Sequence, residues 1–109
     1  MLEDVLCKGR LLDIYGPLLT ERQERCMDMY FNQDLSLAEI GVNLEISRQG
    51  VHDLLHRASQ SLEHYEAKLH LLERAQVLQR EVEMAARLLE GGSTAEIEEA
   101  KRILHRIEL

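Results

Sequence analysis

The segment from residue 35 to residue 58 constrains the fold of this chain more than any other. Its apolar residues repeat at helical spacing in two short runs: Ile40 and Leu44 in the first, and Val51, Leu54 and Leu55 in the second. Ile46 lies between the runs, where it can fill a turn, and Gly41 leaves space for two helices to cross closely. The pattern predicts a helix-turn-helix motif over residues 36–58.

Both helices of this motif carry a start signal. Ser36 is followed three residues later by Glu39, which makes a capping box, and Ser47 can accept a backbone hydrogen bond at the start of the second helix. Glu45 occupies the turn position at which a glycine commonly adopts a positive φ. A left-handed conformation at Glu45 would cost about 1 kcal/mol, and the sequence is equally compatible with a different turn geometry.

Two further helices are predicted upstream of the motif. The first covers residues 2–15 and ends at Gly16-Pro17, and the second runs from a capping box of Thr20 and Gln23 to residue 31. The residues expected to face the core are Val5, Leu6, Leu11, Leu12 and Ile14 in the first helix, and Cys26, Met27, Met29 and Tyr30 in the second. Because the motif alone is too small to fold, these helices supply its hydrophobic backing, and residues 1–70 are predicted to form a helix-turn-helix domain.

Residues 71–109 are predicted to form a C-terminal helical hairpin. A break is expected near residues 70–75, where the apolar spacing changes phase. Gly91-Gly92 ends the next helix, and Ser93 with Glu96 makes a capping box for the last one. The expected apolar stripes are Leu78, Val82, Ala85 and Leu89, and then Ile97, Ala100, Leu104 and Ile107. These stripes could cover the rest of the chain or meet a second copy, and a homodimer is the favoured interpretation.

Composition favours helices throughout. Aromatic residues make up 4% of the chain, and there is one proline, so an all-α fold is expected. Cys7 and Cys26 lie within helical patterns without paired ligand spacing, which indicates buried or half-buried reduced thiols. The first residues are acidic and lead into no long apolar run, so we expect no signal peptide, no membrane span and a cytoplasmic protein.

The motif resembles region 4 of bacterial sigma factors, in which the second helix reads promoter DNA. The combination of YGPLLTERQ, YF, DLSLAEI, ISRQGVHDLLHRA and LEHYEAKL is similar to the YlxM family of small helix-turn-helix proteins, over residues 13–72. The resemblance implies a winged-helix-like DNA-binding class of fold. It also implies a small cytoplasmic bacterial protein that acts in the signal recognition particle (SRP) pathway as a regulator.

The net charge and the helix-turn-helix motif lead to different expectations about nucleic-acid binding. The chain carries a net charge of −7, whereas nucleic-acid-binding domains usually carry a basic footprint. Local charge matters more than net charge within a Debye length of roughly 8 Å, and the second motif helix offers a modestly basic strip. The residues predicted to contact nucleic acid are Ser47, Arg48, Gln49, His52, His56 and Arg57. Gln49 and Arg48 can contact adenine and guanine edges respectively.

Several ligands remain compatible with this face. The candidates are DNA, RNA of the SRP with other particle components, and a protein partner bound without nucleic acid, because fold alone does not fix function. A transcription regulator unrelated to the SRP is a further alternative. His52 and His56 lie four residues apart, but no third zinc ligand accompanies them, and no nucleophile, phosphate-binding loop or carboxylate pair indicates an enzyme. We therefore expect no metal, no cofactor and no catalysis.

Overall fold

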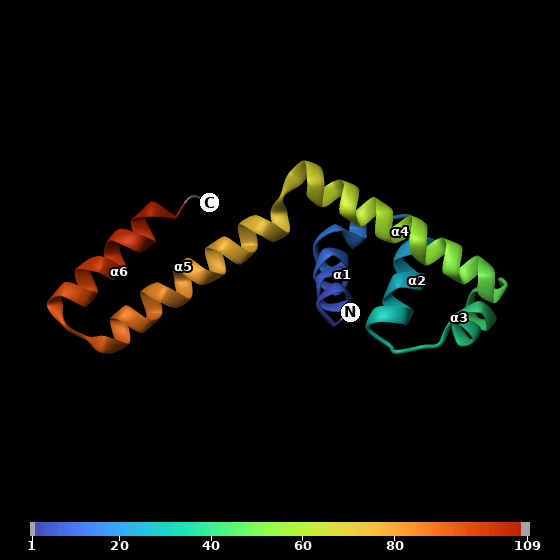
Figure 1. Cartoon of the computed structure of the whole chain (residues 1–109), viewed down its shortest axis with the longest axis horizontal. Helices are drawn as coiled ribbons and strands as arrows, with labels where there is room; N and C mark the ends of the chain where they lie inside the picture. The colour runs from blue at the N-terminus through green and yellow to red at the C-terminus, as the bar shows by residue number, and fades with distance from the viewer. Residues whose placement is uncertain (1, 108–109) are drawn as a thin grey trace. The chain divides into compact units, whose positions relative to one another are not determined.

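The computed structural model describes residues 2–107, with side chains from Val5 onward. The elements are α1 (Leu2–Tyr15), the 3-10 turn η1 (Gly16–Leu18), α2 (Glu21–Phe31), α3 (Leu37–Leu44), α4 (Arg48–Leu69), α5 (Leu71–Gly91) and α6 (Thr94–Arg106) (Figure 1). Residues 2–107 contain no strand. The predicted all-α fold is therefore confirmed. None of the helices within these residues is long and apolar enough to cross a membrane.

Tertiary contacts divide the chain into two units, Met1–Leu72 and Glu73–Leu109. In the first unit α4 packs against α1, α2 and α3, and Figure 1 shows it running alongside all three. In the second unit α5 and α6 run antiparallel as a hairpin (Figure 1). The break between α4 and α5 lies at His70, whose φ of 55° is left-handed, so it falls within the predicted range.

The helix boundaries follow the capping residues that the sequence carries. Capping boxes are formed by Thr20 with Gln23, by Ser36 with Glu39 and by Ser93 with Glu96. Each box satisfies backbone N–H groups that the first turn of a helix leaves without a partner. At the other end, α5 stops at Gly91 and the chain turns at Gly92, whose φ is 74°. All of these predicted boundaries are confirmed.

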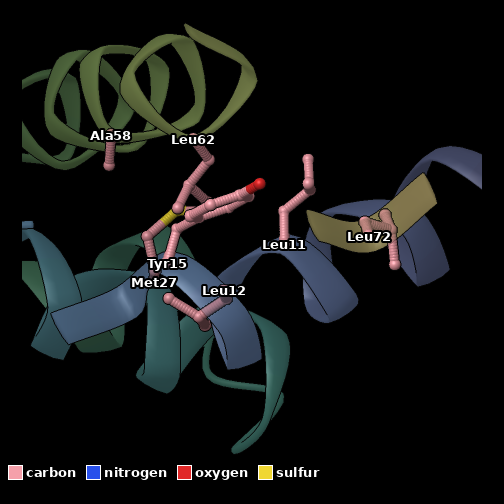
Figure 2. Close-up of a cluster of buried hydrophobic side chains, with 7 residues drawn as sticks. All are labelled: Leu11, Leu12, Tyr15, Met27, Ala58, Leu62 and Leu72. Carbon is pink, nitrogen blue, oxygen red and sulfur yellow. The ribbon is translucent and has the colours of Figure 1, made fainter. Parts of the chain in front are cut away.

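Two clusters of buried side chains hold the first unit together. The first joins α1, α2, α4 and the first turn of α5 and contains Leu11, Leu12, Tyr15, Met27, Ala58, Leu62 and Leu72 (Figure 2). The second joins α2, α3 and α4 and contains Cys26, Met29, Ile40, Leu44 and Val51. Full burial of one large aliphatic side chain stabilises a fold by about 1.5–3 kcal/mol. The two clusters therefore fix α4 on the other three helices.

Some residues expected in the core are exposed. Val5 is 49% exposed and Leu6 56%, because the buried residues of α1 all lie in its C-terminal half, where α2 and α4 cover it. Tyr30 is 40% exposed, and Cys7 is exposed although Cys26 is buried. Burial raises the pKa of the Cys26 thiol, which the nearby Arg22 lowers in part. Tyr15, at 1% exposure, takes the core position on α1 instead.

The core of the second unit is small. It consists of Ala85, Ala100 and Ile103, with Leu88 packed against it. The predicted stripe on α6 is wrong at Leu104, which is 44% exposed, because Ile103 is the residue that turns towards α5. Val82 and Leu89 on α5 are 46% and 48% exposed. Two of the four predicted stripe residues on α5, and one of the four on α6, are thus exposed within the hairpin.

The start of α5 is capped by side chains of the first unit rather than by a local residue. The Tyr15 hydroxyl donates to Glu66 Oε1 at 2.6 Å and accepts from the backbone N–H of Leu71 at 3.1 Å. The N–H of Leu72 donates to Glu66 Oε1 at 3.0 Å. Two of the N–H groups that a helix start leaves unpaired are satisfied in this way.

Candidate nucleic-acid interface

The turn between α3 and α4 depends on Gly41. A Cβ at this position would lie 2.8 Å from the backbone carbonyl oxygen of Ile46. The N–H of Ile46 also donates to the carbonyl of Gly41 at 3.0 Å. Gly41 was expected to face the second helix, and the structure places it against the turn that leads into that helix. A side chain there would push the start of α4 away from α3.

Glu45 adopts the left-handed conformation, with φ 58° and ψ 43°. Its N–H donates to the carbonyl oxygens of Gly41 and Val42, which the end of α3 would otherwise leave unpaired. A non-glycine residue pays about 1 kcal/mol for this conformation. Of the two geometries compatible with the sequence, the structure therefore has the left-handed turn.

Arg22 fixes the end of α3 from outside the motif. Its Nη2 donates to the backbone carbonyl oxygen of Leu44 at 3.0 Å. This contact satisfies one carbonyl at the C-terminal end of α3 and places a cation where the helix dipole favours one. Sequence reasoning missed Arg22, because no local pattern links a residue on α2 with a carbonyl 22 positions further along.

The start of α4 presents the predicted side chains to solvent. Ser47 caps the helix by accepting a hydrogen bond from the N–H of Gly50 at 2.9 Å. Val51 and Ala58 are fully buried, and Leu54 and Leu55 are half-buried. The positions between them point outward, so all six predicted contact residues are exposed: Ser47, Arg48, Gln49, His52, His56 and Arg57. We call these six residues the α4 face.

An acidic residue lies within this surface. Asp53 Oδ1 accepts a hydrogen bond from Gln49 Nε2 at 3.0 Å and lies 3.8 Å from His52 Nδ1. Asp53 therefore orients Gln49 and partly offsets the positive charge of the α4 face. Within residues 2–107 no ion pair engages Arg48 or Arg57. Both guanidinium groups are consequently available to a phosphate.

Comparison with models of known protein families shows which family the chain matches. A family model named UPF0122, described as "Putative helix-turn-helix protein, YlxM / p13 like", matches residues 2–103. The chain belongs to this family. Membership of this YlxM-like family agrees with the motif formed by α3 and α4, and it indicates a binding or regulatory protein rather than an enzyme.

Relatives in the YlxM-like family carry the name UPF0122 protein. One from Bacillus mycoides is 40% identical over 108 residues, which cover 99% of this chain and 97% of the relative. One from Desulforamulus reducens is 41% identical over 101 residues, which cover 89% and 86%. The match to a relative from Clostridium kluyveri is 57% identical over 63 residues and covers 58% of this chain and 57% of that protein.

Two residues of the α4 face are histidines. His52 and His56 are both exposed. Among residues 2–107, no group of three His, Cys, Asp or Glu side chains could hold a metal ion. Among the described residues, the α4 face exposes hydrogen-bond donors and two arginines without an ion-pair partner, on a helix whose inner side is buried.

Proposed function

We propose that this YlxM-like protein is a nucleic-acid-binding regulatory protein that inserts α4 into the major groove of double-stranded DNA. The observation that carries the proposal is the two-sided character of α4. Its inner side is fixed by the buried Val51 and Ala58, and its outer side exposes the α4 face to solvent. A rigid helix with an exposed polar side is what reading of base edges requires.

The α4 face divides into two kinds of contact. Ser47 and Arg48 stand at the N-terminus of α4, where the helix dipole favours an anion, and we assign them with Arg57 to phosphate groups. Gln49, His52 and His56 face outward one turn apart and are assigned to base edges. Asp53 holds the amide nitrogen of Gln49. Asp53 can therefore hold the Gln49 side chain in position for a base, or it can itself accept a hydrogen bond from a cytosine amino group.

The net charge of −7 limits how tightly nucleic acid can bind without sequence preference. Each phosphate contact contributes a slope of about −0.9 in a plot of log affinity against log salt concentration for duplex DNA. With two arginines on the α4 face, we expect a shallow slope of about −2. Binding should accordingly be detected at low salt and depend on sequence.

The test is selection from a random duplex pool at low salt, followed by measurement of Kd for variants. Arg48→Ala and Arg57→Ala should each weaken binding to the selected duplex by about tenfold. Arg87→Ala is a matched control, because Arg87 is an exposed arginine on α5. Failure of the wild-type protein to bind any duplex, or equal effects of all three substitutions, would contradict the proposal.

We infer from the YlxM resemblance that the regulatory role lies in the SRP pathway. The support is the family resemblance, and the exposed α4 face is compatible with an RNA helix end or loop as well as with DNA. Binding to SRP RNA tighter than binding to the selected duplex would support this part of the proposal. Capture of SRP proteins without either nucleic acid would favour the protein-interaction alternative.

We also propose that the hairpin formed by residues 71–109 makes a homodimer. The second unit spans fewer than about 40 residues, a size at which a domain usually needs a disulfide, a metal or a partner. Its core contains two alanines and one isoleucine. Leu78, Val82, Ala85 and Leu89 follow the spacing of a coiled-coil seam, yet only Ala85 is buried. A second copy carries the same stripe and can cover the exposed half.

Sedimentation at micromolar concentration tests the homodimer. The wild-type protein should sediment as a dimer, and Leu89→Asp should shift it to a monomer because a charge would enter the apolar seam. Arg87→Asp, on the same helix but outside the stripe, should remain dimeric. A wild-type protein that is monomeric at tens of micromolar would refute the dimer without affecting the nucleic-acid proposal.

A further inference from the structure

A groove on the first unit lies between the start of α2 and the middle of α4. Its lining residues are Gln23, Arg57, Gln60, Ser61, His64 and Tyr65. None of them is acidic. Three other surface hollows of the described residues each contain at least two carboxylates, in keeping with a chain of 20 acidic and 13 basic residues. The α2–α4 groove therefore departs from the acidic character of the chain.

The acidic residues of α2 point into neighbouring hollows rather than into this groove. Glu24 lines the hollow on the α1 side of α2, together with Asp13 and Asp28. Glu21 lines the hollow next to the end of α3, together with Glu45. The α2–α4 groove is thus free of the carboxylates that would repel an anion, although α2 begins with an acidic turn.

Tyr65 connects the α2–α4 groove to the core of the first unit. The half-buried Tyr65 ring lies 5.9 Å from the buried Tyr15 ring, centroid to centroid, and its hydroxyl donates to the backbone carbonyl of Leu18 at 3.4 Å. The His64 ring meets the Tyr65 ring edge-on at 6.1 Å. The Tyr65 ring therefore packs against the fold, and the exposed side chains around it are the groups that a ligand can reach.

The rim offers mainly hydrogen-bond donors. Arg57, Gln60 and His64 are exposed, and no ion pair within residues 2–107 engages Arg57. On α2, the Oε1 atom of Gln23 accepts from the N–H of Thr20, which leaves the amide N–H₂ of Gln23 for another partner. A cation with several neutral donors and no carboxylate is the chemistry that recognises a phosphodiester oxygen.

We propose that the α2–α4 groove binds the phosphodiester backbone of the nucleic acid whose bases the α4 face contacts. The inference rests on the proposed function and extends it beyond the first two turns of α4. Arg57 belongs to both surfaces, and Gln60, Ser61 and His64 follow it on the same helix. Arg57 and His64 are separated by about 10 Å along the axis of α4, and one DNA strand presents about three phosphates over that length of the duplex axis.

The experiment uses the duplex selected with the wild-type protein and introduces a carboxylate into the groove. Gln60→Glu should weaken binding by about three- to tenfold and make the salt slope shallower by about one unit, without changing the preferred bases. Gln79→Glu, an identical change at an exposed position on α5, is the control and should alter Kd less than twofold. On a duplex trimmed to the bases that the α4 face reads, Gln60→Glu should bind as the wild type does.

The outcomes separate the two proposals. If Arg48→Ala weakens binding while Gln60→Glu behaves like Gln79→Glu, the groove is not a phosphate site and the proposed function stands. If the wild-type protein binds no duplex, both proposals are wrong. His64→Ala gives a second test that adds no charge, and it should weaken binding to the long duplex only. Circular dichroism checks that each variant is folded.

Discussion

The hydroxyl of Tyr15 donates a 2.6 Å hydrogen bond to the carboxylate of Glu66, and together they cap the first turn of α5. Tyr15 ends α1 and Glu66 lies on the last turn of α4, so three hydrogen bonds join the ends of these two helices to the first two residues of α5. The ring of Tyr15 packs in the core with Leu11, Met27 and Leu62 (Figure 2).

Removal of the Tyr15 hydroxyl should destabilise the first unit. Tyr15→Phe keeps the ring but leaves the Glu66 carboxylate and the Leu71 N–H with one partner fewer. A hydrogen bond to a charged group contributes more to stability than a hydrogen bond between neutral groups. We therefore expect the Tm to fall by about 5–10 °C. Tyr65→Phe is the control, since its hydroxyl makes a 3.4 Å contact at the surface. Equal Tm values for Tyr15→Phe and Tyr65→Phe would contradict this role of Tyr15.

Stability at alkaline pH should depend on the same hydroxyl. Burial, and then the hydrogen bond to Glu66, raise the pKa of Tyr15 above its ordinary value. A tyrosine in the unfolded chain titrates near pH 10. The contribution of the neutral hydroxyl is therefore complete below that pH and is lost as the pH rises through the higher pKa of the folded state.

This dependence can be read from urea unfolding of the wild type and Tyr15→Phe between about pH 8 and pH 11. The stability difference between the two proteins should be constant up to about pH 10 and then shrink. A difference that stays constant over the whole range would show that Tyr15 does not titrate with folding.

Alanine substitutions at two glycines should have opposite effects. Gly41→Ala would place a Cβ 2.8 Å from the carbonyl oxygen of Ile46, and forcing the turn apart should cost about 1–3 kcal/mol of stability. At Gly9, within α1, a Cβ would meet no atom within 4 Å. Gly9→Ala should therefore stabilise the protein by about 0.5–1 kcal/mol. Urea titrations measure both, and a tolerated Gly41→Ala would refute the close approach.

Because Arg22 on α2 donates a hydrogen bond to the Leu44 carbonyl, we expect a substitution at Arg22 to destabilise the end of α3. Arg22→Met keeps most of the aliphatic side chain but leaves the Leu44 carbonyl unpaired, which should cost about 1–2 kcal/mol. The loss should appear as faster amide exchange at the end of α3. Arg25→Met, an exposed neighbour on α2, should cost less than about 0.5 kcal/mol. Similar effects of the two substitutions would remove the assigned role of Arg22.

Local sequence patterns predicted the helix ends but not the long-range contacts. The capping boxes at Thr20, Ser36 and Ser93 involve residues three positions apart, so the chain itself displays them. The bonds from Arg22 to Leu44 and from Tyr15 to Glu66 join residues 22 and 51 positions apart, and only the packed helices bring them together.

The difference between local patterns and long-range packing also explains why some residues predicted to be buried are exposed. Val5 and Leu6 match the apolar period of α1, but periodicity does not show how far a neighbouring helix extends. On α6, Ile103 and Leu104 are adjacent apolar residues, and a small rotation of the helix decides which one is buried. The α4 face could be predicted because Val51, Leu54, Leu55 and Ala58 define the inner side and leave the exposed positions between them.

We propose that the α4 face is the surface that contacts nucleic acid. An NMR titration of the uniformly ¹⁵N-labelled protein with the selected duplex, following every backbone amide, shows which residues the duplex contacts. The largest chemical-shift changes should fall on residues 47–57, with smaller changes at Gln60 and His64. Changes confined to residues 73–106, or none at saturating duplex, would contradict the claim.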